Sequence, residues 1–464
     1  MSVRSLNVKW KKTTEINVPQ FVPDIGDIFG QTTHYDVMAP GLDFAFGFAG
    51  RSYIDKAQNR NWLKGDQTQT TPALFGNTHE FNAEVQLEPI AGLKITLTGN
   101  RTDKRTDQVQ FMYANPTTIY TGSYTKTHMA LATALKGFKA EDNYHSETFD
   151  KFLSNIPIIA ERLQQKYMGT TYPTYGFFMD TEMAGQTYSL ENGAINTSSS
   201  DVLIPAFMAA YSGKDANKVD LNPFPGIKAI LPNWRVTYDG LMRIPFFKKM
   251  FKAFNLNHSY QCTYSVGSFT SFSDWVTIGD GLGFTQDVLT GGAIPSSPYN
   301  IASITLTEKF APLFGFTATF MNDISFNAQY DNQRTLTMNS SAGQLVEAVT
   351  TSFTLGGSYK IANFNKVLKL KTKQQNINND LTFNLNVKMS SNASLIRKIE
   401  TNTAQATNGT RTWAINFTAN YVVSKRITVG AYFDHQTNTP LVSTNSYPTT
   451  SSNYGLSINM SLVK

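Results

Sequence analysis

The segment Leu-Thr-Phe-Asn-Leu-Asn-Val-Lys-Met at positions 381–389 alternates large apolar residues with polar ones. Successive side chains of a β-strand point to opposite faces, so this segment has one apolar face and one polar face. The polar face consists mainly of uncharged amide and hydroxyl groups. The segment therefore predicts a strand about as long as a membrane-crossing β-strand, which needs about 9–11 residues.

The same alternation recurs along most of the chain. We count roughly fourteen such segments, joined by turns such as Pro89–Gly92 or by longer polar loops. Clear examples lie at 41–50, 79–88, 93–98, 256–266, 314–330, 349–359, 413–423 and 454–462. A soluble β-sandwich also alternates and remains an alternative. Several segments, however, exceed the mean soluble strand of about 5–6 residues. We therefore expect an all-β fold: an antiparallel transmembrane β-barrel wall.

Composition supports this interpretation and excludes several other classes. Only 16% of the residues are charged, against about 25% in ordinary soluble domains, while 41% are hydrophobic. The single Cys262 excludes an intramolecular disulfide and any multi-cysteine metal site. A net charge of +6 is scattered along the chain, so we expect no nucleic-acid partner. No apolar run is long enough for a membrane-spanning helix, and Met1–Lys12 lacks the features of a secretory signal.

Aromatic and basic residues near segment ends suggest contacts with the membrane surface. Barrels carry aromatic girdles at both interfaces, and the candidate girdle residues are Trp10, Tyr113, Trp275, Trp413 and Tyr454. The alternating Lys369, Lys371 and Lys373 could contact anionic lipid headgroups or form a solvated strand end.

The stretch 137–250 interrupts the alternation. Ser146 can cap a helix with apolar residues at helical spacing, with Pro157 as a kink and Gly169 as a stop. The chain thus divides into barrel strands at 1–136, an irregular insertion with one amphipathic helix at 137–250, and barrel strands at 251–464. We expect the insertion to form a cap, a plug or a lobe. The cap or gate candidates are Val202, Leu203, Ile204, Pro205, Phe207 and Trp234.

No catalytic or metal-binding motif is recognisable. The six histidines are widely spaced, and the glycine-rich run Gly279–Gly283 lacks the following helix that a nucleotide-binding loop requires. We expect a protein that is not an enzyme and that holds no cofactor or metal. Glu84 and Glu88 share a strand face, which fits acid–base chemistry or, with better support, a charged barrel lumen.

The polar faces supply candidates for the lining of a pore. Their amides, hydroxyls and few charges would wet a channel without binding its contents tightly. These candidates are Asn82, Glu84, Gln86, Glu88, Lys94, Thr96, Asn384, Asn386, Asn416 and Asn420.

Four runs resemble the C-terminal part of the SprA/Sov family: Asp201–Asp215, Leu231–Leu241, Phe246–Lys249 and Phe254–Tyr260. Shorter matches at 379–381, 396–399 and 439–444 extend the resemblance over most of the chain. This family is the outer-membrane translocon of type IX secretion, which also serves gliding motility where that is present, in Bacteroidota. The resemblance implies a barrel of about 36 strands that passes folded cargo proteins across the outer membrane of a Gram-negative bacterium.

The resemblance also implies partners. These are the secreted cargo proteins, a plug protein, a smaller outer-membrane shuttle barrel, outer-membrane lipid and the remaining strands of the same barrel. Family members are several times longer, so we expect a C-terminal fragment or a split gene product. The alternative is a self-contained porin-like or lipid-transport barrel, which uses the same alternation.

Overall fold

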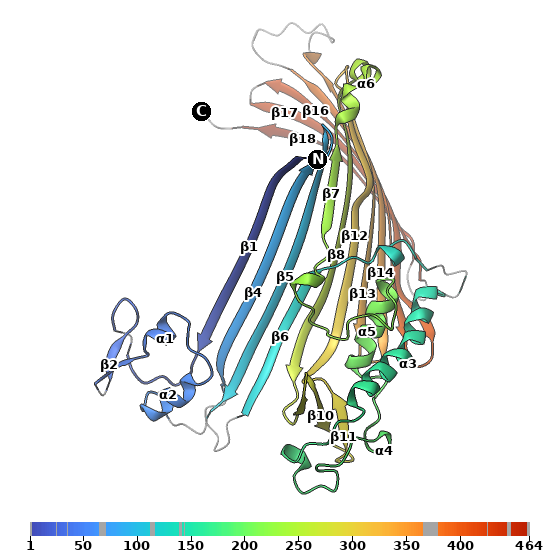
Figure 1. The fold of residues 1–464 in the computed structure, drawn as a ribbon. Helices are drawn as coiled ribbons and strands as arrows, with labels where there is room; N and C mark the ends of the chain where they lie inside the picture. Colours follow the sequence, from blue (N-terminus) through green and yellow to red (C-terminus); the bar gives the residue numbers. More distant parts are fainter. Residues whose placement is uncertain are drawn as a thin grey trace.

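The computed structural model describes residues 2–24, 26–34, 36–64, 71–111, 117–138, 142, 144–364, 379–424, 426–442 and 447–461. Thirteen strands form one antiparallel sheet in the order β1-β4-β5-β6-β8-β12-β13-β14-β15-β16-β17-β18, with the short β7 paired to both β5 and β8 (Figure 1). The expected all-β fold with an irregular, partly helical insertion is confirmed.

The strands of this sheet are β1 (Ser2–Asn17), β4 (Ala73–Glu88), β5 (Leu93–Gln110), β6 (Thr117–Thr127), β7 (Asn233–Tyr238), β8 (Phe251–Ser271), β12 (Tyr299–Phe320), β13 (Ser325–Asn339), β14 (Gln344–Ile361), β15 (Leu381–Lys398), β16 (Thr403–Ser424), β17 (Ile427–Pro440) and β18 (Thr449–Met460). β12 and β16 each have 22 residues. At about 3.3 Å per residue they are roughly 70 Å long, about twice what a membrane crossing requires.

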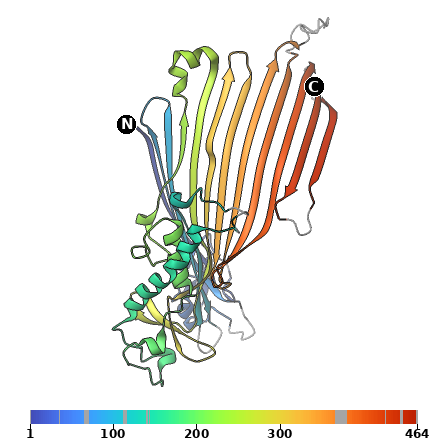
Figure 2. The same cartoon turned by 90° about the vertical axis from the view of Figure 1, so that its right-hand side faces the viewer.

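The sheet is curved and open. Within the described residues, β1 pairs only with β4 and β18 only with β17, so these two strands form its edges. Figure 2 shows them on opposite sides of the wall. Both edges bend to the same side, which gives the sheet a concave face and a convex face (Figure 1).

A helical lobe covers the lower part of the convex face (Figures 1 and 2). It comprises residues 128–138, 142, 144–232 and 272–298, and we call it the lobe. Its elements are α3 (Glu147–Tyr167), α4 (Leu190–Gly193), α5 (Ser200–Tyr211), β9 (Val276–Gly279), β10 (Leu282–Gln286) and β11 (Ala293–Ser296). The structure thus moves the predicted boundaries of 137–250, because β7 belongs to the wall and the β9–β11 sheet belongs to the lobe.

The predicted helix and its cap are confirmed. The Ser146 side chain accepts a hydrogen bond from the Phe149 backbone N–H, and α3 continues through Pro157 for 21 residues. Gly169, with φ of +83°, lies just beyond the helix end. The apolar run Val202–Tyr211 forms the second long helix, α5, which packs against α3.

A smaller lobe at the lower end of β4 and β5 contains β2 (Thr32–His34), β3 (Val37–Ala39), α1 (Leu42–Ala45) and α2 (Tyr53–Asn59). The predicted strand at 41–50 is wrong, because this segment forms α1 and a loop. Gly41 and Gly47 have φ of +96° and +71°, which an extended strand cannot accommodate. Asp43 meanwhile pairs with Lys56 at 2.7 Å. A short helix, α6 (Pro245–Met250), precedes β8 at the opposite end of the wall.

Candidate functional site: the two faces of the wall

The cross-strand register carries one polar face across the whole sheet. Gln86 lies opposite Thr96, and Asn386 lies opposite Asn416. Directly paired residues share a face, and following the register from strand to strand places all ten pore-lining candidates on the concave side. Their role as a pore lining stays a prediction, but their common placement is what that role requires.

Hydrogen bonds between neighbouring strands order this polar face. Asn416 donates to Asp434 at 2.8 Å, and Asn384 donates to Thr418 at 3.2 Å. Within β4, Gln86 donates to Glu84 at 2.7 Å. These amides and hydroxyls satisfy one another, while exposed charged residues such as Lys9, Arg235 and Lys388 lie on the same face. The concave face as a whole is polar and suited to contact with water.

Glu88 has a more local function than the other pore-lining candidates. Its carboxylate accepts a hydrogen bond from the backbone N–H of Gly92 at 3.0 Å and forms an ion pair with Arg4. It therefore stabilises the turn between β4 and β5 and links that turn to the edge strand. The alternative of acid–base chemistry with Glu84 gains no support, because Glu84 is bonded to Gln86.

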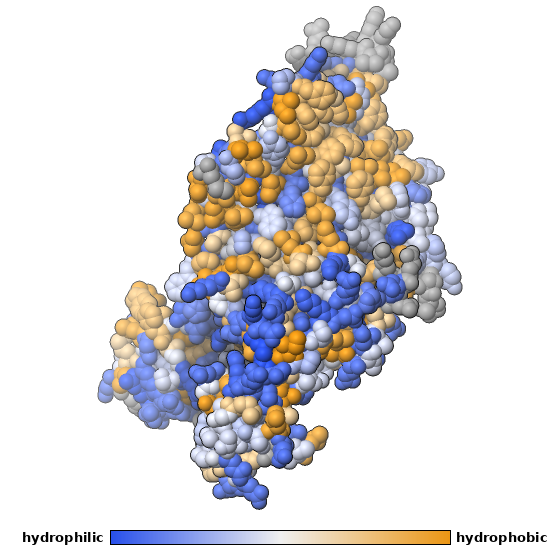
Figure 3. Space-filling model, turned by 45° about the vertical axis from the view of Figure 1, so that its right-hand side comes forward, coloured by the Kyte–Doolittle hydropathy of each residue, from blue (hydrophilic) through white to orange (hydrophobic). Residues whose placement is uncertain are grey.

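The convex face is apolar, and its exposure changes along the strands. In the upper half Leu385 is 45% exposed and Leu456 is 80% exposed. In the lower half the side chains on this same face are covered by the lobe and at most 1% exposed: Tyr264, Ile304, Leu306, Met338 and Leu345. Figure 3 shows the resulting division into an apolar upper region and a polar lower region.

A row of large side chains crosses the convex face where the exposed region ends. The register places them side by side on five successive strands: Phe314, Tyr330, Phe353, Met389 and Trp413. We call this set the aromatic row. Immediately below it, the same face carries a polar row: Asn332, Thr351, Ser391 and Arg411. The surface therefore changes from apolar to polar over two residues of each strand, which is the distance between neighbouring side chains on one face.

The height of the exposed apolar band follows from β16. Trp413 belongs to the aromatic row and Tyr421 lies near the upper end of the strand, with Ile415, Phe417 and Ala419 between them on the same face. Eight steps of about 3.3 Å give roughly 26 Å along the strand. A lipid-facing band about 25 Å tall between aromatic girdles is typical of outer-membrane barrels.

The predicted girdle residues lie in different parts of the structure. Trp413 lies in the aromatic row, and Trp10 and Tyr454 are exposed on the convex face of the two edge strands. Trp275 was wrongly assigned, because it lies in the lobe, where its indole N–H donates to the Ser296 carbonyl at 3.0 Å. Tyr113, Lys369, Lys371 and Lys373 lie outside the described residues.

The cap or gate prediction needs correction. The α5 candidates are Val202, Leu203, Ile204, Pro205 and Phe207, and all five are buried between α3 and the sheet. They cannot line a route along the concave face, because the lobe that contains them packs on the convex face. Trp234 lies in β7, in the wall itself, with its ring stacked on Tyr260 at 4.5 Å.

Two buried ion pairs fix the lobe to the wall, and the sequence did not reveal them. Arg334 pairs with Glu308 at 3.2 Å and donates to the Thr133 hydroxyl and the Lys136 carbonyl. The second pair is Arg397 with Glu347, also at 3.2 Å. Both arginines lie on the convex face among apolar neighbours. A charge is tolerated there because a glutamate lies on the adjacent strand, and the sequence of one segment does not show that pairing.

Helical membrane crossings and metal centres receive no support from the structure. Among the residues that it covers, no helix combines the length and the apolar character needed to cross a membrane. Nor does any group of three or more His, Cys, Asp or Glu side chains in the described ranges have the arrangement of a metal site.

Comparisons with known proteins give weak likenesses. No model of a known protein family matches the sequence, and no curated protein matches it either. Among solved structures, OmpT, an outer membrane protein of Vibrio cholerae, is 9% identical with a TM-score of 0.20, over 84% of this chain and 94% of that one. An anion-selective porin from Comamonas acidovorans is 10% identical with a TM-score of 0.18, over 85% and 93%. These values are too low to carry an argument about function.

Proposed function

We propose that this chain forms part of the wall of an outer-membrane channel that passes folded proteins in type IX secretion, as the resemblance to the SprA/Sov family implies. The observation that carries the proposal is the open, curved sheet with an apolar convex face and a polar concave face. Such a wall, completed by further strands, encloses a wide hydrated pore.

The free edges support a larger assembly. In lipid, every backbone N–H and C=O group must find a partner within protein, and an unpaired strand edge is not tolerated. β1 and β18 lie on opposite sides of the wall and so do not pair with each other. We infer that other strands of the same barrel pair with both edges.

The connections suggest an orientation. Outer-membrane barrels have short periplasmic turns and longer extracellular loops. The described parts of the long connections 18–72, 128–232 and 272–298 lie at the lower end in Figure 1. We therefore place the lower end of Figure 1 outside the cell. The exposed apolar band then lies in the membrane, and the lobe lies on the extracellular side of the outer leaflet.

The proposed mechanism is physical rather than catalytic. The hydrogen-bonded amides and hydroxyls of the concave face keep the lumen wet. The partners we propose are those of the family: secreted cargo, a plug protein, the smaller shuttle barrel and outer-membrane lipid. No nucleic acid has a role. Where gliding motility is present, we propose that the same channel serves it.

The test is the size and behaviour of the native polypeptide in the outer-membrane fraction. An antibody against the last 20 residues should detect a band several times larger than 51.6 kDa, or a 51.6 kDa chain that co-purifies with the missing strands. Its mobility on gels should change on heating, as that of a folded barrel does. A heat-modifiable 51.6 kDa band that migrates alone and conducts ions after reconstitution would show a self-contained porin or lipid transporter instead.

A further inference from the structure

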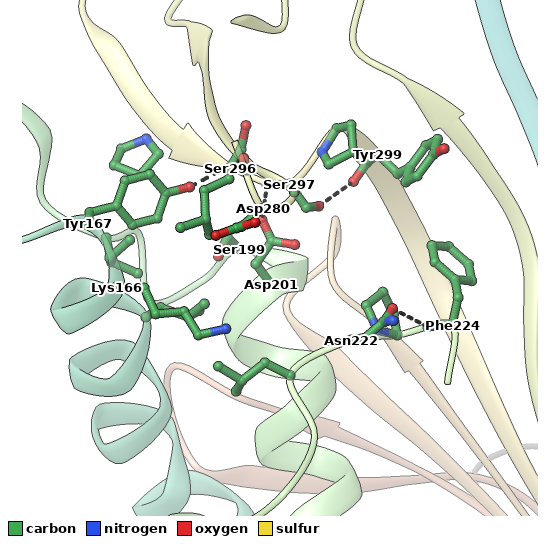
Figure 4. A pocket seen from close by; sticks show the side chains of 18 of the residues that line it. Lys166, Tyr167, Ser199, Asp201, Asn222, Phe224, Asp280, Ser296, Ser297 and Tyr299 are labelled. Atoms are coloured by element: carbon green, nitrogen blue, oxygen red, sulfur yellow. Dashed lines mark hydrogen bonds between the residues drawn. The ribbon is translucent and has the colours of Figure 1, made fainter. Parts of the chain in front are cut away.

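The lobe contains a cavity of about 350 Å³ at the junction of three of its parts (Figure 4). The last turn of α3, the first turn of α5 and the β9–β11 sheet surround it, and residues 221–224 close one side. A volume of this size is within the range of small-molecule sites. The cavity lies outside the apolar band and on the convex side, so the proposed channel function makes no use of it.

One buried hydroxyl in this cavity has no protein partner. The Ser296 side chain is 8% exposed, and its Oγ forms no hydrogen bond with any described residue. Its carbonyl, by contrast, accepts from Trp275 at 3.0 Å and from Tyr167 at 3.4 Å. A buried hydroxyl without a partner is unfavourable, and a bound ligand that pairs with it removes that penalty.

Acidic groups stand beside this hydroxyl. Asp201, in the first turn of α5, accepts a hydrogen bond from the Ser297 backbone N–H at 2.8 Å, and Figure 4 shows it pointing into the same space as Ser199. The Ser199 side chain does not cap α5, although it occupies the N-cap position. Asp280, in the turn between β9 and β10, is a second carboxylate of the lining.

Basic and aromatic groups complete the lining. The Lys166 ammonium extends toward the cavity and forms no ion pair with a carboxylate in the described ranges (Figure 4). Arg105 donates to the Tyr299 hydroxyl at 3.4 Å, and its charge is balanced by an ion pair with Asp103 at 3.1 Å. The rings of Phe224 and Tyr299 meet edge to face at 5.7 Å and form an apolar wall.

We propose that this cavity binds a saccharide of about one or two rings. Two carboxylates disfavour a strongly anionic ligand, and the Lys166 ammonium disfavours a strongly cationic one. A neutral molecule with many hydroxyls can instead donate to Asp201, accept from Lys166, pair with Ser296 and lay an apolar ring face against Tyr299. Free sugar and a glycan attached to a lipid supply this same chemistry.

The experiment measures saccharide binding to the full chain in its native barrel, purified in detergent. Saturation-transfer NMR is recorded with glucose, galactose, mannose, N-acetylglucosamine and maltose, and with citrate and putrescine as charged probes. At least one saccharide should bind, and Ser296→Ala should weaken its binding at least tenfold. Asp201→Asn should weaken it similarly. Comparison of lipopolysaccharide with its released polysaccharide tells whether the lipid-attached glycan or the sugar alone is preferred.

Tyr211→Phe is the matched control, because the Tyr211 hydroxyl is also buried and without a partner but lies outside the cavity. This variant should bind the saccharide as the native chain does. Ser296→Ala removes an unpaired group, so its unfolding temperature should be unchanged or higher, which separates a lost contact from a lost fold. Binding of none of the five saccharides, undiminished binding in Ser296→Ala, or binding of citrate or putrescine alone would overturn the proposal.

Discussion

At the scale of single residues, Arg334 and Arg397 explain why the lobe stays on the wall. Each guanidinium is buried beside a glutamate on a neighbouring strand and also donates to a backbone carbonyl of the lobe, that of Lys136 or Tyr144. A buried charge without its partner is strongly unfavourable, so each pair acts as a unit. The lobe is thus held by directional bonds as well as by apolar contact.

Breaking one of these pairs should loosen the lobe. We expect Arg334→Leu to destabilise it by about 3–5 kcal/mol, because Glu308 is then buried without a counter-charge. The measurement is the urea dependence of limited proteolysis within residues 170–230, alongside heat-modifiable mobility of the barrel. Arg411→Leu is the control, because Arg411 is exposed on the same face. The double variant Glu308→Met with Arg334→Leu should recover most of the loss. A single variant with native protease resistance would contradict this assignment.

His128, at the junction of β6 and the lobe, should make the lobe sensitive to acid. Burial, with smaller contributions from the charges of Lys126 and Lys214, lowers the pKa of His128 from its ordinary 6.5 to about 3. The unfolded chain therefore binds a proton that the folded chain does not. This contribution to stability is complete above pH 6.5 and is lost as pH falls from 6.5 towards 3, by at most about 1.4 kcal/mol per pH unit.

The change that tests this is His128→Gln, which can retain a hydrogen bond to the Ser212 hydroxyl, now 2.7 Å from Nε2. Urea unfolding of the lobe between pH 7.5 and pH 4 should become less dependent on pH in the variant. The same slope in both proteins would mean that other groups govern the acid response.

At the scale of elements, the aromatic row sets the level of the membrane on the wall. The apolar band above it is roughly nine residues deep, and the polar row begins directly below it. Substitution of a lipid-facing residue by arginine costs about 2–4 kcal/mol at mid-membrane and about 0–1 near the interface. The two sides of the row should therefore tolerate charge very differently.

β15 offers a matched pair of positions for this comparison. Leu385 lies opposite Phe417 in the middle of the band, whereas Ser391 lies opposite Arg411 in the polar row. We expect Leu385→Arg to destabilise the refolded barrel by about 2–4 kcal/mol and Ser391→Arg by no more than about 1 kcal/mol. Urea unfolding in lipid vesicles, followed by gel mobility, measures both. Equal costs at the two positions would place the membrane elsewhere on the wall.

The alternation of apolar and polar residues predicted most strands, because successive side chains of a strand point to opposite faces and a short segment is enough to show this. It also placed the ten concave-face residues on one side, since neighbouring strands repeat the same pattern. It failed at 41–50, where Gly41 and Gly47 turn the backbone and Asp43 bonds to Lys56. The aromatic row and the buried ion pairs depend on the register between strands, which no single segment encodes.

The lobe shows a second limit of sequence reasoning. The helix α3 was predictable from the cap at Ser146, whereas α5 was not predicted, because its residues are apolar on nearly all sides and show no helical period. The face on which the two helices pack was not predictable either, because apolar side chains in a loop fit a plug inside a barrel as well as a cover outside it. Only the buried contacts of α5 with the convex side of β12 decide between the two.

At the scale of the whole molecule, the separation of β1 from β18 distinguishes a wall segment from a closed barrel. We consider variants with one cysteine introduced in Leu6–Lys12 and a second in Asn453–Ser457. In the native membrane these two cysteines should form no disulfide with each other. The two sets lie on opposite edges, and a disulfide requires Cα atoms within about 7 Å. The natural Cys262 is buried and does not interfere. Intramolecular cross-linking in high yield would show that the chain closes on itself.

The way in which the lobe shares its core with the wall also dictates the order of biogenesis. The Ala130 backbone N–H bonds to the hydroxyl of Tyr260, and Thr133 is held by Arg334, which lies 201 residues further along the chain. Part of the lobe's interior is therefore the lower surface of β8, β12 and β13, and β12 and β13 follow the whole lobe in the sequence. The core of the lobe can therefore be completed only after β12 and β13 have been synthesised.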